Sequence, residues 1–581
     1  MKKLHVQLLL AVAGLFQAAT AMAASADAIY FGGDILTMKG KSPQYAQALA
    51  VRGGKIAFVG SKASAMKLRG ESTKVVDLGG ATLLPGFIDG HAHMIQFGKN
   101  LIDADLFGTS DMADLLARMK AQAAKVPEGA WIVGFGYQAK RMKEGRTPTV
   151  EELDTVSADR PVMVVDSSGH LGAGNSALFK LTGISASTAD PAGGNFSRKP
   201  GSQELLGPME ETALNAVRAQ RPAFTGQLAD QVATGGAAVW ASFGQTTAQE
   251  CGVGLGADDI SLVRNAIDKK LLPIDLYVCA KDSATDSVIN AAYSARADYQ
   301  PEGTLSKLLA ARSDLDKRYI NRVRLGGIKF WLDGSVDTAW FAKPYTLNPP
   351  GKTGEYSGYE QISDATLDAA FDKFWTTGIQ LNMHMNGDAA AEQALRAIER
   401  AVKKHGMRDH RPVFIHASYL RPDQIDRMKK YGAVPSFLTA SLPAAGDFVV
   451  KLWGEERAAH SMAAKTMTKK GIPFSFSHDA PVSPSPAVLP IVDAGVNRRT
   501  ASGVVVGPDE RVSPYDGLRA VTAMAAYQIK EEKTKGTLEP GKLADMVILE
   551  KNPLKVDPLT IKDIQVLETL KEGQTVYQLK R

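Results

Sequence analysis

Cysteine is nearly absent from this chain of 581 residues, which contains only Cys251 and Cys279. Two cysteines cannot form a disulfide framework or supply a cluster of thiolate ligands to a metal. We therefore expect any metal site to use nitrogen and oxygen ligands. An oxidising compartment would permit a bridge between the two cysteines, but the sequence favours small buried apolar side chains at both positions.

Long apolar runs and dense charge are also missing. The one apolar stretch, LLLAVAGLF near the N-terminus, is shorter than the roughly 20 residues that cross a bilayer. It follows the basic MKK and precedes the small residues ATAMA, so we expect a signal peptide over residues 1–23 and an exported, periplasmic protein without stable membrane insertion. The net charge of +6 is not gathered into a block of Lys and Arg, which predicts no nucleic-acid partner.

Two kinds of pattern divide the rest of the chain. Short strands with Gly-Gly turns occupy residues 24–85 and return in residues 521–581, so we expect the two segments to pair as one small β domain. Between them, in residues 86–520, apolar strands alternate with amphipathic helices, the pattern of βαβ units. This α/β region suits a (β/α)₈ barrel with an inserted subdomain at about residues 105–320.

Four histidines stand where predicted barrel strands end. His91 and His93 in GFIDGHAHM are two residues apart, and side chains at that spacing on a strand share one face. His384 in QLNMHM and His416 in VFIHAS end two later strands. Because the carboxyl ends of parallel barrel strands face the active site, we expect these imidazoles to converge. Asp479, after GIPFSFSH, joins them as a ligand or general base, the alternative being an Asx turn.

Lys329 interrupts GGIKFWLDGS, a strand that should be buried on both faces. A buried ammonium group is costly unless it is paired or neutral. One interpretation pairs it with Asp333, four residues further on. In the other, the neutral amine adds carbon dioxide and becomes a carbamate, a two-oxygen anion that can bridge two divalent cations.

Together these side chains predict a metal centre in which His91, His93 and Asp479 hold one cation. His384 and His416 would hold a second cation, and a Lys329 carbamate would join the two. Nitrogen and oxygen ligands favour two Zn²⁺ ions first, with Mn²⁺, Fe²⁺ or Co²⁺ also compatible. Water acidified at such a centre attacks a carbonyl carbon, and Asp479 is the catalytic residue that carries the proton to the leaving nitrogen.

The chain resembles the amidohydrolase superfamily in GFIDGHAHM, SHDAPV and the closing KGTLEPGKLADMVILEKNP. The motifs GGIKFWLDGS, HMNGDAAAEQAL and GNSALFKLTGI narrow the resemblance to the third amidohydrolase family, the N-substituted formamide deformylase-like metal-dependent hydrolases. This resemblance implies a distorted TIM barrel, a β-sandwich built from both termini, and hydrolysis of carbon–nitrogen bonds other than peptide bonds. It also implies the same metal-ligand positions, of which the lysine is a carbamate in only some members.

The resemblance further implies a set of residues around the substrate. His170 and Glu211 match positions that line the substrate pocket. His478 stands where relatives carry a small residue such as serine, and it could contact substrate or point away from the site. Trp331 and Trp340 could wall the pocket or pack in the core.

Three functions stay open on the sequence alone. The first is a metal-dependent amidase or deformylase acting on a small-molecule amide, and the second is a lactone, ester or cyclic-amide hydrolase using the same centre. The third is a non-catalytic periplasmic binding protein that reuses the barrel, against which the complete ligand set argues. An oligomer is compatible with the sequence.

Overall fold

The computed structural model describes residues 25–167, 169, 171–191, 194–288, 319–349 and 352–580. The expected signal peptide and His170 lie outside these residues. In the part of the chain that the structure describes, no helix has both the length and the apolar character needed to cross a membrane.

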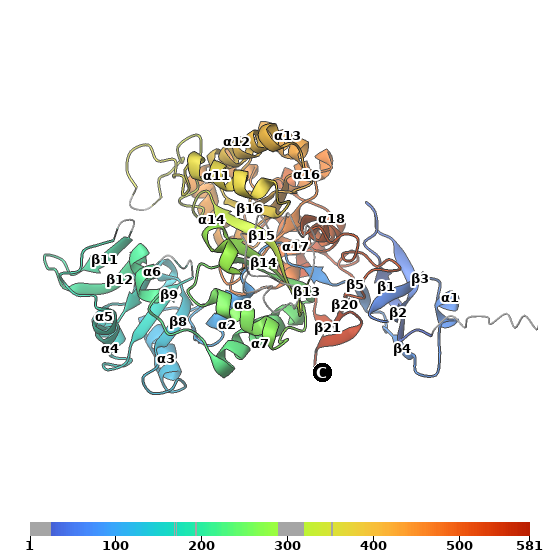
Figure 1. Cartoon of the computed structure of the whole chain (residues 1–581), viewed down its shortest axis with the longest axis horizontal. Helices are drawn as coiled ribbons and strands as arrows, with labels where there is room; N and C mark the ends of the chain where they lie inside the picture. Colours follow the sequence, from blue (N-terminus) through green and yellow to red (C-terminus); the bar gives the residue numbers. More distant parts are fainter. Residues whose placement is uncertain are drawn as a thin grey trace, which may run out of the picture.

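Eight parallel strands form one curled sheet in the middle of the molecule (Figure 1). This confirms the predicted α/β class and parallel sheet. In spatial order the strands are β19 (Ser475–Phe476), β18 (Val434–Phe437), β17 (Val413–His416), β16 (Gln380–Met385), β15 (Val323–Trp331), β14 (Asp275–Lys281), β13 (Gln245–Val253) and β6 (Phe87–Ile88).

The two edge strands of this sheet meet through the residues that follow them. The N–H of His93 donates to the carbonyl of Ala480 at 2.9 Å, and the N–H of Asp479 donates to the carbonyl of His91 at 3.1 Å. The hydroxyl of Ser436 donates to the carbonyl of Gly90 at 3.0 Å. The sheet is therefore drawn round on itself at its carboxyl edge, and the same residues that join the edges are candidate ligands.

Helices pack against the curled sheet. They include α2 (Met94–Asn100), α7 (Gly226–Ser242), α8 (Asp259–Asp268), α11 (Asp364–Trp375), α12 (Asp388–His405), α13 (Pro422–Tyr431), α14 (Ser441–Trp453), α15 (Glu455–Ala459), α16 (Ala464–Lys470), α17 (Val488–Asn497), α18 (Pro514–Ala520) and α19 (Ala523–Gln528). In α12 the buried Ala391, Leu395, Ile398 and Ala401 recur at helical spacing, so one face packs on the sheet.

The chain between β6 and β13 forms a second sheet, which lies to the left of the central sheet in Figure 1. Its order is β11 (Gly194–Arg198), β12 (Leu205–Glu211), β10 (Leu171–Gly174), β9 (Val162–Asp166), β8 (Ile132–Tyr137) and β7 (Ala104–Asp105). It packs with α3 (Met112–Ala123), α4 (Val150–Asp154), α5 (Ser176–Thr182) and α6 (Thr212–Arg218). Because β13 and β14 belong to the central sheet, the segment that forms the second sheet is shorter than the insertion expected at about residues 105–320.

A third sheet combines both ends of the described chain, to the right in Figure 1. Its path is β22 (Gln574–Gln578), β21 (Val566–Lys571), β20 (Met546–Leu549), β5 (Thr82–Pro85), β1 (Ala28–Leu36), β2 (Tyr45–Arg52) and β3 (Lys55–Gly60), with β4 (Lys74–Asp77) beside β1. Leu84 of β5 lies opposite Val547 of β20 in an antiparallel pair. The N-terminal and C-terminal segments therefore share hydrogen bonds, as their strand patterns predict.

Buried charges connect this terminal sheet to the amino end of the central sheet. Lys571, at the end of β21, contacts Asp275 at 2.6 Å and Asp545 at 2.7 Å. Lys535 contacts Asp275 at 2.6 Å and Glu531 at 2.6 Å. All five side chains are buried, so each charge depends on the others for compensation.

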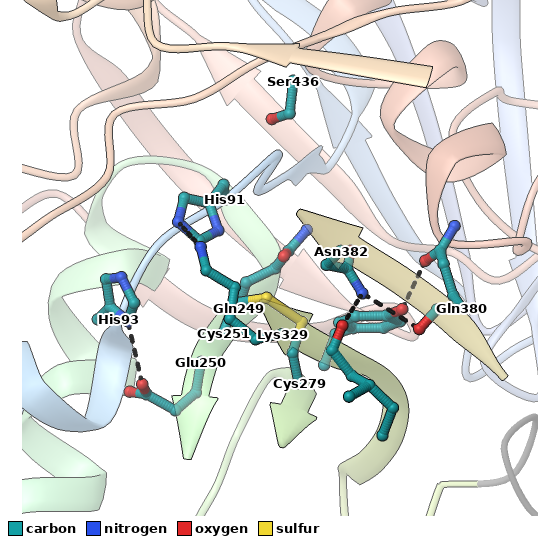
Figure 2. The surroundings of a disulfide bond; sticks show 12 residues. His91, His93, Gln249, Glu250, Cys251, Cys279, Lys329, Gln380, Asn382 and Ser436 are labelled. Atoms are coloured by element: carbon teal, nitrogen blue, oxygen red, sulfur yellow. Dashed lines mark hydrogen bonds and ion pairs between the residues drawn. A yellow bond between two sulfur atoms is a disulfide. The ribbon is translucent and has the colours of Figure 1, made fainter. Parts of the chain in front are cut away.

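The two cysteines form a disulfide, which corrects the expectation of unpaired buried thiols. Cys251 on β13 lies in register with Cys279 on β14, with Cα atoms 4.3 Å apart. Both side chains are buried in a small apolar cluster that also contains Ile88 and Ile415. The bond therefore ties two neighbouring parallel strands together inside the central sheet (Figure 2).

Candidate metal centre

Asp479 meets the two histidines of the GFIDGHAHM motif at the carboxyl edge of the sheet. Its Oδ1 lies 3.3 Å from Nε2 of His91 and 3.4 Å from Nε2 of His93. Each of the three residues offers one ligand atom, and these atoms all lie within 4.8 Å of one another. The two histidines of this HxH segment (residues 91–93) and the aspartate far along the chain therefore converge, as the sequence predicts.

Backbone conformation at this edge is unusual for residues with side chains. His416, Ala417 and Asp479 have φ angles of 68°, 44° and 53°. Such left-handed conformations are uncommon outside glycine, and they persist where the surrounding structure holds them. Here they turn the chain sharply after β17 and β19, which directs the imidazole and the carboxylate toward the same centre.

The two later histidines extend the group. Nε2 of His416 lies 3.8 Å from Oδ2 of Asp479, and the rings of His416 and His384 stand 4.6 Å apart, edge to face. Nε2 of His384 lies 3.1 Å from the carbonyl oxygen of Gly334. This contact fits an Nε2–H that donates to the carbonyl, and in that tautomer the lone pair is on Nδ1 of His384.

Lys329 is buried beside this group, 1% exposed, with Nζ 3.3 Å from Nε2 of His91. Its partner is not Asp333, which corrects the pairing considered from the sequence. Asp333 instead accepts backbone N–H donors from Trp340, Asn386 and Gly387 at 2.8–3.1 Å. The carboxylate thus shapes the loops after β15 and β16 rather than neutralising the lysine.

The electrostatics favour unprotonated nitrogen ligands at most of these positions. Burial lowers the pKa of Lys329 to about 7, although Asp479 opposes this shift. Burial likewise lowers the pKa of His416 to about 4, and burial with the Lys329 charge holds the pKa of His91 well below its usual value. At neutral pH the imidazoles of His91 and His416 are therefore neutral, the form that binds metal.

His93 and Asp479 behave as a pair. Burial opposes the charged imidazole, but the nearby carboxylates of Asp479 and Glu250 outweigh burial and raise the pKa of His93 to about 9. Burial also opposes the ionised Asp479, yet His93 and the other nearby cationic groups hold the pKa of this carboxyl below its ordinary value. Asp479 is consequently a carboxylate at neutral pH, with the charge that a cation requires.

Glu250 is a member of the site that has no motif in the sequence. It lies in β13, where all nine residues are buried, and its Oε1 is 3.4 Å from Nδ1 of His93 (Figure 2). The available signal was an acidic residue inside a strand that is buried on both faces, because such a charge needs a specific partner.

The predicted substrate-contact residues are spread more widely. Trp331 ends β15 half-buried, with its ring 5.1 Å from Nζ of Lys329. Glu211 is exposed at the end of β12. Burial raises the pKa of Tyr359, and the charge of Glu211 raises it further. His478 is 1% exposed and directs Nε2 toward Asp89 at 3.6 Å. Its substrate contact, like those of Trp331 and Glu211, stays a prediction.

A cavity of about 520 Å³ borders the segment after β15 and the start of α12. Trp340, Tyr419 and Arg421 are among its walls. The N–H of Trp340 donates to Asp333, which itself lies 3.7 Å from Nε2 of His384. Trp340 therefore lines this cavity, and its backbone is linked to His384 through Asp333.

The donor set fits a divalent cation. Ligand atoms about 2.0–2.1 Å from a tetrahedral Zn²⁺ lie about 3.3–3.4 Å from one another. The distances of 3.3 and 3.4 Å from Asp479 to the two Nε2 atoms match this spacing. Oδ1 of Asp479 is also buried without a hydrogen-bond donor among the described residues, so a cation there would satisfy it.

A curled parallel sheet with a His-His-Asp group at its carboxyl edge defines the class of metal-dependent hydrolases. The match to known proteins is more specific: residues 74–577 match the Amidohydrolase family, and the chain belongs to that family.

Individual relatives and solved structures agree with this assignment. A putative amidohydrolase, YtcJ, from Bacillus subtilis is 26% identical over 95% of this chain and 99% of its own length. An N-substituted formamide deformylase from Arthrobacter pascens is 25% identical over 92% of this chain and 95% of its own length. The crystal structure of an uncharacterised metal-dependent hydrolase from Pyrococcus furiosus is 25% identical, with a TM-score of 0.70, covering 91% of this chain and 100% of that one.

Proposed function

We propose that this protein hydrolyses a carbon–nitrogen bond in a small-molecule amide or formamide. The observation that carries the proposal is the convergence of His91, His93 and Asp479, whose ligand atoms lie within 4.8 Å of one another. Similarity to an N-substituted formamide deformylase over nearly the whole chain supports an N-formyl or N-acyl amine as the substrate class.

We assign the cation ligands as the sequence predicts. His91, His93 and Asp479 would hold one cation, and His384 and His416 would hold a second, with Zn²⁺ favoured and Mn²⁺, Fe²⁺ or Co²⁺ compatible. A divalent cation in such a site acidifies water and stabilises the negative charge that develops on a carbonyl oxygen.

Asp479 is the proton carrier in this proposal. Its carboxyl is ionised at neutral pH, so it can accept a proton from the attacking water and deliver it to the leaving nitrogen. The carbon–nitrogen bond then breaks to give a carboxylic acid, formic acid for a formamide, and a free amine. The same proton path serves a lactone, an ester or a cyclic amide, which the experiment must therefore include.

Lys329 is proposed as the bridge between the cations. Its neutral amine would attack the carbon of carbon dioxide and release one proton, giving a carbamate whose single negative charge is shared by two oxygens. Burial favours this chemistry because it lowers the pKa of the amine to about 7, against the opposing effect of Asp479. The position of Nζ, 3.3 Å from Nε2 of His91, supports a reach into the centre.

The test is hydrolysis by the purified full chain, loaded with Zn²⁺ or Mn²⁺, of a panel of N-formyl amines, N-acyl amines, lactones and aryl esters. We expect release of amine from one of the first two groups, loss of activity with a chelator, and recovery when metal is returned. Metal content per chain, expected to be two equivalents, is measured on the same sample.

The Asp479→Asn variant should lower kcat by about 10²–10⁴-fold, because it removes the proton carrier. Asp509→Asn, a change at an exposed aspartate, is the matched control and should leave kcat unchanged. Turnover of esters or lactones alone would contradict the proposed substrate class. Tight ligand binding without turnover of any carbonyl substrate would instead identify a binding protein.

We further propose that the mature protein is periplasmic. The N-terminal residues MKK, LLLAVAGLF and ATAMA support export, and the Cys251–Cys279 disulfide supports an oxidising compartment. Cell fractionation, together with an intact mass that begins after Ala23, tests this proposal. Full-length protein in the cytoplasm would contradict it.

The separate sheets are proposed to act as the inserted subdomain and the terminal β-sandwich that the family resemblance implies. The six-stranded sheet has its own apolar clusters, which supports an independent packing unit. The charge of Glu211 acts on Tyr359, so this unit borders the loops after β15 and can supply residues to the substrate pocket.

A further inference from the structure

Glu250 is a buried acid whose side chain contacts His93 and the first turn of helix α2. Its side chain is 6% exposed within the fully buried strand β13. An ionised carboxylate in such surroundings is costly unless hydrogen bonds satisfy it. The partners of Glu250 therefore indicate why the acid is present.

One carboxylate oxygen of Glu250 caps helix α2. Oε2 accepts the N–H of Ile95 at 2.6 Å and the N–H of Gln96 at 3.2 Å. These N–H groups belong to the first turn, where a helix has no internal acceptor for them. His93 is the N-cap residue of α2 and supplies no side-chain cap itself, so Glu250 provides it from the neighbouring strand.

The other oxygen faces the ring of His93. Oε1 lies 3.4 Å from Nδ1, while Nε2 on the opposite side of the ring faces Asp479 at 3.4 Å. In the neutral, metal-binding form of the ring, a carboxylate beside Nδ1 favours the tautomer with the proton on Nδ1, which leaves the lone pair on Nε2. The ring is thus oriented between two acids, with its metal-binding atom toward the centre.

This arrangement is specific to one histidine. Nδ1 of His91 and Nδ1 of His416 are both buried, and among the described residues neither has a hydrogen-bond partner. The distances and partners therefore distinguish His93 from its neighbour two residues earlier in the chain.

The strand that carries Glu250 is itself held in place. The N–H of Cys251 donates to the carbonyl of Ala92, the residue between the two histidines, at 3.0 Å. Cys251 is also bonded to Cys279 on β14 (Figure 2). Backbone, side chain and disulfide thus fix the position of Glu250 relative to the HxH segment.

We propose that Glu250 is a positioning residue for the metal centre, holding His93 as the Nδ1–H tautomer while anchoring the start of α2. This inference rests on the proposed function for its metal, but the orientation of the ring is a property of the protein without metal. Glu250 acts through His93 and takes no part in bond breaking.

The test uses Glu250→Gln in the full chain. The glutamine oxygen can still accept from Ile95 and Gln96, but the amide then turns its NH₂ toward Nδ1 of His93 and favours the opposite tautomer. We expect nuclear magnetic resonance of isotope-labelled histidine in the metal-free protein to show that switch for His93 at a pH above its pKa of about 9, where the ring is neutral. Competition with a chelator should show Zn²⁺ affinity lowered by about 10–100-fold.

Glu510→Gln is the matched control. Glu510 is equally buried and accepts the N–H of Thr466, in the first turn of α16, so its loss has a similar effect on a helix start without touching the centre. This control should leave Zn²⁺ affinity and the His93 tautomer unchanged.

Two results would overturn the inference. One is a Glu250→Gln protein with the wild-type tautomer and wild-type Zn²⁺ affinity. The other is an equal loss of affinity in Glu510→Gln. If the wild-type chain binds no metal, the proposed function fails, whereas a tautomer switch in metal-free Glu250→Gln would still support the positioning role.

Discussion

At the scale of single residues, the site depends on side chains that would be costly anywhere else. A lysine 1% exposed and a carboxylate at a left-handed backbone position both reduce stability unless other groups compensate them. Lys329 and Asp479 compensate each other only in part, because His91 and His93 lie between or beside them. Such uncompensated groups concentrate where chemistry occurs.

The role of Lys329 can be tested by removing its amine. Lys329→Ala should lose at least one of the two metal equivalents and most activity, because no bridging anion can form. Acetate or propionate should restore part of the rate by supplying a carboxylate in the vacated space. Metal analysis and steady-state kinetics measure both effects.

Lys281→Ala provides the control for that experiment. Lys281 lies in register with Lys329 on the neighbouring strand β14 and has the same side chain. It should retain metal and rate. A Lys329→Ala protein with two metals and full activity would remove Lys329 from the centre.

The sequence predicted the converging ligands better than their surroundings. His91, His93, His416 and Asp479 follow strand ends, and a parallel sheet brings all such ends to one edge. Glu250 was missed because its role arises from the contact between β13 and α2, which no spacing along the chain reveals. The Lys329–Asp333 pairing failed because the loops after β15 and β16 offer Asp333 backbone donors.

At the scale of elements, the disulfide joins β13 to β14 beneath the metal centre. Its two cysteines are 28 residues apart, and a closed loop of that length limits the unfolded chain. In the loop-entropy model such a bond contributes ~3–4 kcal/mol to the free energy of unfolding. The sequence could not assign the pair, because pairing depends on the register of two strands connected through α8.

Replacing both cysteines, Cys251→Ala with Cys279→Ala, should therefore lower the free energy of unfolding by ~3–4 kcal/mol. Urea unfolding of the oxidised wild type and the double variant measures the difference. Reduced wild-type protein is the companion sample and should resemble the variant. Equal unfolding midpoints for all three proteins would show that the bond contributes nothing.

At the scale of the whole molecule, buried charges connect the terminal sheet to the central one. Burial opposes ionisation of Asp275, but Lys535 and Lys571 outweigh it and hold the pKa of this carboxyl below its usual range. The stabilisation from Asp275 is therefore complete above about pH 4 and is lost as the pH falls through its lower folded-state pKa. The sequence predicted the association of both termini from strand patterns, but not this ionic contact.

Lys571→Met should lower the free energy of unfolding by roughly 3–5 kcal/mol near neutral pH, because it leaves buried acids undercompensated. The difference in free energy of unfolding between variant and wild type should shrink toward pH ~3. In the variant the pKa of Asp275 is lowered less strongly, so this carboxyl takes up a proton in that range. Urea unfolding across this pH range measures the change.

Lys555→Met is the control for the same sheet. Lys555 is 58% exposed and pairs with Asp34, so its removal should lower the free energy of unfolding far less than Lys571→Met does. A Lys571→Met deficit that equals the control, or that stays constant with pH, would contradict the proposed importance of the buried contact.

The terminal sheet also determines when the molecule can finish folding during synthesis. β5 leaves the ribosome early, yet its partner β20 is made only after all strands of the central sheet. Until then one edge of β5, with the apolar Leu83 and Leu84, has no strand beside it, and an unpaired apolar edge promotes association between chains. A nascent chain, or one truncated before β20, should therefore need a chaperone most at this edge, and synthesis of β20 covers it.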